Sequence, residues 1–161
     1  MDKLDRIDIR ILDLLQNDAR LTNKQIAEEL GMSTTPVFER IKKLEKKGVI
    51  QKYVALVDRR KVGKNLLAYG SVRLKEHTQT SISTFVAQVK DFPEVIECMH
   101  TTGMGDYLLK IVVDDMDAYH RFVMDKLSAI TVISHVETSF VLDEVIKTTA
   151  FPLLTEKNEQ E

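Results

Sequence analysis

The sequence is short of the residues that build cross-linked, metal-bound or membrane proteins. It has one Cys in 161 residues, no Trp and three Pro. One Cys excludes a disulfide framework and a multi-cysteine zinc site, and the four His show no metal-ligand spacing with it, so no metal site is expected. No run approaches the ~18 apolar residues that cross a bilayer, and the opening MDKLDRIDIR carries no apolar signal block. We therefore expect a soluble, cytoplasmic protein without a membrane partner.

Signatures of catalysis are also missing. The sequence has no nucleophile elbow, no P-loop and no paired-carboxylate pattern. Gly103-Met104-Gly105 lacks the third glycine and the strand-to-helix context of a dinucleotide fingerprint. Cys98 and His100 share one side of a strand, where a buried thiol beside a hydrogen-bonded His is a better interpretation than a ligand pair. The sequence indicates neither an enzyme nor a cofactor-binding protein.

Charge is divided unevenly along the chain, although the net charge is only −2. Residues 1–64 contain 15 basic and 10 acidic residues, whereas residues 65–161 contain 8 and 15. The basic excess is concentrated in residues 33–64, with 10 basic against 3 acidic residues. Clustered positive charge in one part of a chain favours a polyanionic partner for that part.

The first 48 residues contain three helical patterns. A first helix has apolar residues at three- and four-residue steps. Thr22 and Gln25 have the spacing of a capping box, and Gly31 supplies the turn that ends a second helix. A third helix begins at Ser33 as N-cap and stops at Gly48. Two short helices joined by a turn with a Gly, after a longer first helix, match the helix-turn-helix pattern.

The third helix carries the candidate contacts to DNA. Hydroxyls at its N-terminus suit a phosphate or a base edge, and Arg40 can fork onto guanine or a phosphate. Glu39 could accept from a cytosine amino group or simply be solvated. No aromatic platform interrupts the cations, which argues against single-stranded nucleic acid. The predicted residues that bind double-stranded DNA are Asn23, Lys24, Ser33, Thr34, Thr35, Pro36, Arg40, Lys43 and Lys47.

The rest of the chain predicts a second domain. Residues 49–57 are β-branched and extended, and the charged residues 58–65 read as a linker. Strand and helix patterns then alternate, with strands expected at 66–75, 94–101, 107–113 and 132–142 and helices at 79–91 and around 116–127. The order βαββαβ is that of a ferredoxin-like sandwich, in which two helices cover one face of an antiparallel sheet. The fold class is therefore α+β.

Five segments of the sequence together form a specific pattern: Leu4-Asp5-Arg6-Ile7-Asp8, Thr34-Thr35-Pro36 with Arg40-Ile41 and Leu44-Glu45, Gly48-Val49-Ile50, Thr102-Gly103, and Asp106-Tyr107-Leu108-Leu109. On these segments the sequence resembles the Lrp/AsnC, or feast/famine, family of transcriptional regulators over nearly its whole length. It implies an N-terminal winged-type helix-turn-helix domain, a ferredoxin-like effector domain, homodimers that assemble further, often to octamers, and a small-molecule effector, commonly an amino acid.

The resemblance also implies an effector site in the loop before the third strand of the second domain. The residues carried over are Thr102, Gly103, Met104, Gly105, Asp106 and Tyr107. Two glycines let backbone groups approach a ligand closely, and Asp106 would take an ammonium group or cap the loop. A plain hairpin loop is the alternative from spacing alone. The Pro-Gly pair that the family often has before the last strand is replaced here by Ile130-Thr131-Val132-Ile133, which puts the local turn in question.

Together these expectations define a prokaryotic, nucleoid-associated regulator that changes its assembly or DNA affinity with an amino-acid effector and needs no cofactor. The alternatives are an architectural protein that bends DNA with little sequence preference and, less favoured, a relative of haem-precursor decarboxylases. The expected domains are 1–57 for DNA binding, 58–65 as linker, 66–154 for effector binding and oligomerisation, and a polar tail at 155–161.

Overall fold

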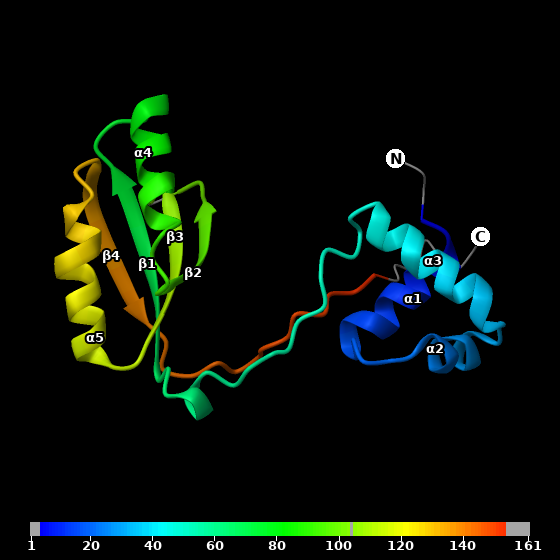
Figure 1. The fold of residues 1–161 in the computed structure, drawn as a ribbon. Coiled ribbons are helices and arrows are strands. Elements are labelled where there is room, and N and C mark those ends of the chain that lie inside the picture. Colours follow the sequence, from blue (N-terminus) through cyan, green and yellow to red (C-terminus); the bar gives the residue numbers. More distant parts are fainter. Residues whose placement is uncertain (1–3, 104, 154–161) are drawn as a thin grey trace. The chain divides into compact units, whose positions relative to one another are not determined.

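The chain forms two compact units (Figure 1). The computed structural model describes residues 4–103 and 105–153. One unit comprises the chain up to Leu56 together with the segment that starts at Ile146, and the other runs from Val57 to Val145. The N-terminal unit ends at Leu56, one residue before the expected 57. The second boundary differs, because the expected effector domain ended at 154, whereas residues from Ile146 group with the N-terminal unit; the tail 155–161 lies outside the described residues.

The N-terminal unit contains three helices, α1 (Arg6–Asn17), α2 (Asn23–Leu30) and α3 (Thr34–Lys46). The capping box between Thr22 and Gln25 is present, and Gly31 ends α2 in the left-handed conformation at φ 64°. A second capping box, between Asp5 and Asp8, starts α1. These local signals explain why the helix boundaries were predictable from sequence.

The helices share one small core. Ile11, Ile26, Val37 and Leu44 are all at most 2% exposed, and they come from all three helices. After α3 the chain runs extended, and the described residues of this unit contain no strand. The core fixes which side of α3 faces inward and therefore which side faces solvent.

The second unit is a four-stranded antiparallel sheet with helices on one face (Figure 1). Its elements are β1 (Leu66–Leu74), α4 (Gln79–Val89), β2 (Val95–His100), β3 (Tyr107–Val113), α5 (Met116–Arg121) with a π-helical turn (Phe122–Lys126) and a 3-10 turn (Leu127–Ala129), and β4 (Ile133–Phe140). The predicted order βαββαβ is confirmed. The strand order in the sheet is β2-β3-β1-β4, and the core contains residues from the strands and from both helical segments.

The predicted linker is a structured part of the second unit. Residues Arg60–Val62 form a 3-10 turn. The Arg59 guanidinium donates to the carbonyls of Lys64 and Asn65 at 3.0 and 2.7 Å and pairs with Glu144 at 3.1 Å. The segment that leaves β4 is thus tied to the segment that enters β1. Within the described part of the chain, no helix is long and apolar enough to cross a membrane.

Candidate DNA-binding and effector sites

The N-terminus of α3 presents a free hydroxyl cluster. Ser33 occupies the N-cap position, but its side chain makes no capping hydrogen bond. Ser33, Thr34 and Thr35 are exposed, while Pro36 is partly buried. Hydroxyl and N–H groups at a helix N-terminus favour an anion. The sequence-predicted hydroxyls therefore lie together on the surface.

Arg40 has a different partner from the one expected. Its Nη1 donates to Asp5 Oδ2 at 2.6 Å and to Asp8 Oδ1 at 2.7 Å, linking α3 to the start of α1. Hydrogen bonds to Asp5 and then to Asp8 raise the pKa of Arg40. Burial alone would raise the pKa of Asp5, but the Asp8 N–H and Arg40 outweigh it and the pKa is lowered. Arg40 is engaged inside the N-terminal unit, and the sequence did not show this because its partners are 35 and 32 residues away.

The solvent side of α3 carries lysines that sequence reasoning did not select. With Val37, Ile41 and Leu44 buried, steps of ~100° place Lys42 and Lys46 on the side opposite the core. Lys42 and Lys43 flank Lys46 on its two sides, at ~40° and ~60° from it, and all three are exposed. The helical wheel centred on the buried residues would have identified Lys42 and Lys46; grouping cations beside Arg40 did not.

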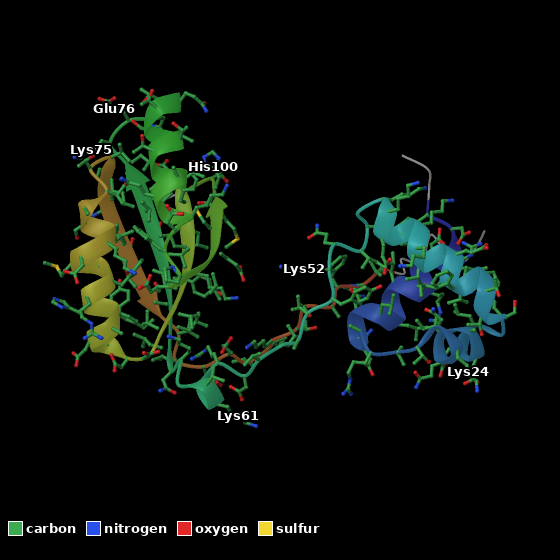
Figure 2. All side chains as sticks on the ribbon, in the orientation of Figure 1. Lys24, Lys52, Lys61, Lys75, Glu76 and His100 are labelled. Carbon is green, nitrogen blue, oxygen red and sulfur yellow. The ribbon has the colours of Figure 1, made fainter. Side chains whose placement is uncertain are left out.

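The remaining predicted DNA contacts lie at the surface of the N-terminal unit. Lys24 is 80% exposed, and its ammonium is 3.9 Å from Glu28; Figure 2 shows it projecting from α2. Asn23 is half-buried and Lys47 exposed. Asn23 also lines a shallow recess of about 220 Å³ whose other walls are Leu15, Ala19, Leu21, Phe38, Ile41, Lys42, Glu45 and Tyr53.

The loop between β2 and β3 is closed by its own hydrogen bonds. The Thr101 N–H donates to the Asp106 carbonyl at 2.9 Å, and the Thr101 hydroxyl donates to the Gly105 carbonyl at 3.2 Å. The Asp106 N–H donates to the Val72 carbonyl at 2.8 Å, which ties the loop to β1. Thr102 and Gly103 are exposed at the tip, where Gly103 has φ 118°, and Met104 lies outside the described residues.

Asp106 holds the base of this loop. Its Oδ2 accepts from the Leu74 N–H at 2.7 Å, and its Oδ1 is 2.8 Å from His77 Nε2. The Leu74 N–H, followed by His77, lowers the pKa of Asp106. Both carboxylate oxygens therefore have partners. Of the two sequence-based options for Asp106, capping the loop is the one that these contacts support.

Gly105 is required by close packing. A Cβ built on this residue would overlap Ser71 Oγ and lie 3.2 Å from the Val72 carbonyl oxygen. Tyr107 follows as a core residue, 5% exposed, with its ring 4.6 Å from the Phe85 ring and 5.0 Å from the His100 ring. Of the six residues expected to line an effector pocket, Thr102 and Gly103 are the described ones that face solvent.

Cys98 and His100 do share the helix-covered side of β2, since they pair with Leu109 and the buried Tyr107 of β3. The expectation of a buried thiol is wrong, because Cys98 is exposed. Partial burial of its sulfur still raises its pKa. Among the described residues, no group of three or more His, Cys, Asp or Glu is arranged to hold a metal ion.

The chain joins a helix-turn-helix unit with a cationic third helix to a second, α+β unit. This is the architecture of a one-component regulator, in which one chain carries both the DNA-binding and the effector domain. Residues 4–51 match the family model for a winged helix-turn-helix DNA-binding domain, and residues 67–151 match that of the Lrp/AsnC ligand-binding domain. The chain belongs to the Lrp/AsnC family of DNA-binding transcriptional regulators.

Similarity to individual relatives supports this family assignment. The chain is 35% identical to the Bkd operon transcriptional regulator of Pseudomonas aeruginosa, over 95% of this chain and 100% of the relative. It is 35% identical to a leucine-responsive regulatory protein of Rhizobium meliloti, over 89% and 92%. A Neisseria meningitidis transcriptional regulator solved as its L-Met complex superposes with a TM-score of 0.90 at 37% identity, over 94% and 97%.

Proposed function

We propose that this regulator binds duplex DNA through the solvent side of α3 and that a free amino acid, bound at the loop 101–106, changes this binding. The exposed hydroxyls and lysines of α3 carry the first half of the proposal, since they lie on one side of a helix whose other side is core. A helix of this kind fits the major groove, with cations contacting the phosphates.

The proposal that an amino acid binds at this loop is supported by the exposed backbone of the loop and by a relative that was solved with a bound amino acid. The tip at Thr102 and Gly103 offers a hydroxyl and exposed backbone groups, which suit a carboxylate. Asp106 would act through the loop, as a positioning residue that holds the tip, rather than as the partner of an ammonium group. A relative solved with L-Met makes an amino acid the first class of effector to test.

The proposed regulator works as a homodimer that assembles further, to octamers, in the cytoplasm and in association with the nucleoid. The sheet face away from α4 and α5 supports a dimer, because it mixes half-buried apolar and charged side chains. Lys110 pairs there with Glu97 at 2.8 Å, beside Leu108 and Val112. We further propose that the chain is not an enzyme and needs no cofactor beyond the effector.

The test uses the full chain and fluorescently labelled duplexes. We expect binding at 50 mM salt and a steep loss by 200 mM, because each neutralised phosphate adds about 0.9 to the slope of log affinity against log salt. One operator that binds at least ~10³-fold more tightly than random DNA supports sequence-specific regulation, whereas equal affinities favour an architectural protein. Absence of binding at 50 mM, or turnover of a haem-precursor carboxylate, contradicts the proposal.

Effector binding is tested by thermal shift with the twenty amino acids, followed by light scattering for assembly. A rise in melting temperature with one amino acid, together with a changed mass or DNA affinity, supports the proposal. If none of the twenty shifts either quantity, the amino-acid effector is wrong even when DNA binding is confirmed.

A further inference from the structure

The DNA-facing side of α3 contains two residues that phosphate binding does not explain. Phe38 is 46% exposed and is not part of the helical core. Glu39 is exposed, and among the residues that the structure describes it has no hydrogen-bond or ion-pair partner. An apolar ring gains nothing from a phosphate, and a carboxylate is repelled by one.

Both residues lie where a recognition helix approaches base edges. From the buried Val37, one and two helical steps of ~100° place Phe38 at the edge, and Glu39 near the centre, of the solvent side. They belong to the second turn of α3, and the N-terminal part of such a helix is the part that enters the groove. Consecutive residues rise by about 1.5 Å along the helix, so the two can contact neighbouring base pairs.

The neighbouring charges make a carboxylate tolerable at this place. Lys42 lies three residues after Glu39, and its ammonium is 5.8 Å from the centroid of the Phe38 ring and 3.2 Å from Glu45 Oε2. Lys43 is exposed one helical turn after Glu39. Arg40 is held by Asp5 and Asp8. Lys43 can take a flanking phosphate, and this leaves Glu39 and Phe38 to meet the floor of the groove.

The major groove offers one chemical match to each side chain. A carboxylate accepts from the exocyclic amino group of cytosine, and an apolar side chain packs on the C5-methyl group of thymine. We infer that Glu39 and Phe38 determine sequence specificity by reading a cytosine and an adjacent thymine in each half-site. This inference rests on the proposed function, because it requires that α3 bind duplex DNA.

The experiment starts from in vitro selection of bound duplexes out of a random library, with the full-length wild type, E39Q, F38A and the control K46A. For the wild type we expect enrichment of a cytosine next to a thymine. E39Q should exchange that cytosine preference for adenine, the base that Gln reads. F38A should lose the thymine preference alone. K46A should enrich the wild-type sequence, with weaker binding and a shallower salt slope.

A second measurement tests the methyl contact chemically. Replacing the selected thymine by deoxyuridine removes only the C5-methyl group. We expect wild-type affinity to fall several-fold and the affinity of F38A to stay unchanged. The E39Q exchange should alter the ratio of affinities for the two bases by about 5- to 150-fold, as one good base contact does.

The outcomes separate this inference from the proposed function. If E39Q and F38A enrich the wild-type sequence, the inference is overturned while duplex binding stands. If F38A weakens binding to all sequences equally, Phe38 is a wall of the recess beside Tyr53 and not a reader of thymine. If neither the wild type nor any variant binds duplexes at 50 mM salt, the proposed function and the inference both fail.

Discussion

The solvent side of α3 and the loop 101–106 treat their polar side chains in opposite ways. On α3 most of them are left unused by the fold: Lys43 and Lys46 point to solvent, and Ser33 makes no cap hydrogen bond. In the loop the fold uses two of them, since Thr101 bonds to the loop backbone and Asp106 to β1, and Thr102 at the tip is exposed. A rigid helix can present free side chains, whereas a loop without secondary structure needs its own side chains to hold its shape.

Arg40, like Lys42 and Glu45, is bonded to other side chains of the N-terminal unit, and Arg40→Ala should give the largest effect. It leaves Asp8, whose side chain is 12% exposed, without its cationic partner. We expect a loss of about 2–3 kcal/mol in the free energy of unfolding, the range for a hydrogen bond to a charged group with one partner left buried. Chemical denaturation followed by circular dichroism measures it.

Two controls sharpen this prediction. Arg40→Lys should recover most of the loss, because one Arg nitrogen, Nη1, makes both bonds and a single ammonium can replace it. Lys46→Ala should leave stability within about 0.5 kcal/mol of the wild type, as expected for an exposed residue. A stable Arg40→Ala protein that has lost only DNA binding would show that Arg40 belongs with the free cations of α3 after all.

Local pattern predicted the helices well, and tertiary contact decided the rest. The cap at Thr22 and Gln25 and the turn at Gly31 are short-range features, so the sequence contains them. The partners of Arg40, Asp106 and Gln16 lie 29 to 135 residues away, and no spacing rule reports them. For the same reason the linker and the C-terminal boundary differed from expectation.

Gly105→Ala tests whether the loop depends on close packing. The added Cβ would overlap Ser71 Oγ and approach the Val72 carbonyl, so the loop must move away from β1. We expect a cost of about 1–3 kcal/mol, typical of overpacking, and loss of any effector-induced thermal shift. Unchanged stability would mean that the loop can move to accommodate a Cβ, so that close packing against β1 does not hold it.

The double variant Gly105→Ala with Ser71→Ala separates the two contacts. It removes the overlap with Ser71 Oγ and leaves the Cβ of residue 71 at the ordinary distance of 3.5 Å. We expect recovery of about half of the stability, with the remainder due to the Val72 carbonyl at 3.2 Å. Full recovery would assign the whole effect to the Ser71 hydroxyl.

Acid should weaken the loop through Asp106. Its pKa in the folded chain lies below the ordinary 3.8, so the ionised carboxylate is more stable in the folded chain than in the unfolded one. This contribution is complete above the unfolded pKa and is lost as the pH falls through the folded one. Wild type should therefore exceed Asp106→Asn in unfolding free energy at about pH 6, and the gap should begin to narrow as the pH falls below the unfolded value of 3.8.

The comparison with Asp106→Asn cancels the other carboxylates, of which Asp5 also has a lowered pKa. His77 and Arg73 are the neighbours whose side chains lower the pKa of Asp106, and both are retained in the variant. A gap that stays constant from pH 6 to pH 3 would mean that the Asp106 charge does not hold the loop.

Gln16→Ala should give the smallest effect, and it tests whether a side chain on the surface of α1 holds a distant segment of the chain in place. The Gln16 amide nitrogen donates to the Phe151 carbonyl at 2.8 Å, and its amide oxygen accepts from the Phe151 N–H at 3.2 Å. Both bonds are neutral and exposed, so Gln16→Ala should cost at most about 1 kcal/mol while raising hydrogen exchange at the Phe151 amide. Asn17→Ala is the matched control, because Asn17 bonds to the Asp13 carbonyl of its own helix and not to Phe151.

If both variants leave hydrogen exchange at Phe151 unchanged, contacts other than those with α1 hold the segment after Ile146. Distant polar contacts would then not explain why this segment belongs to the N-terminal unit.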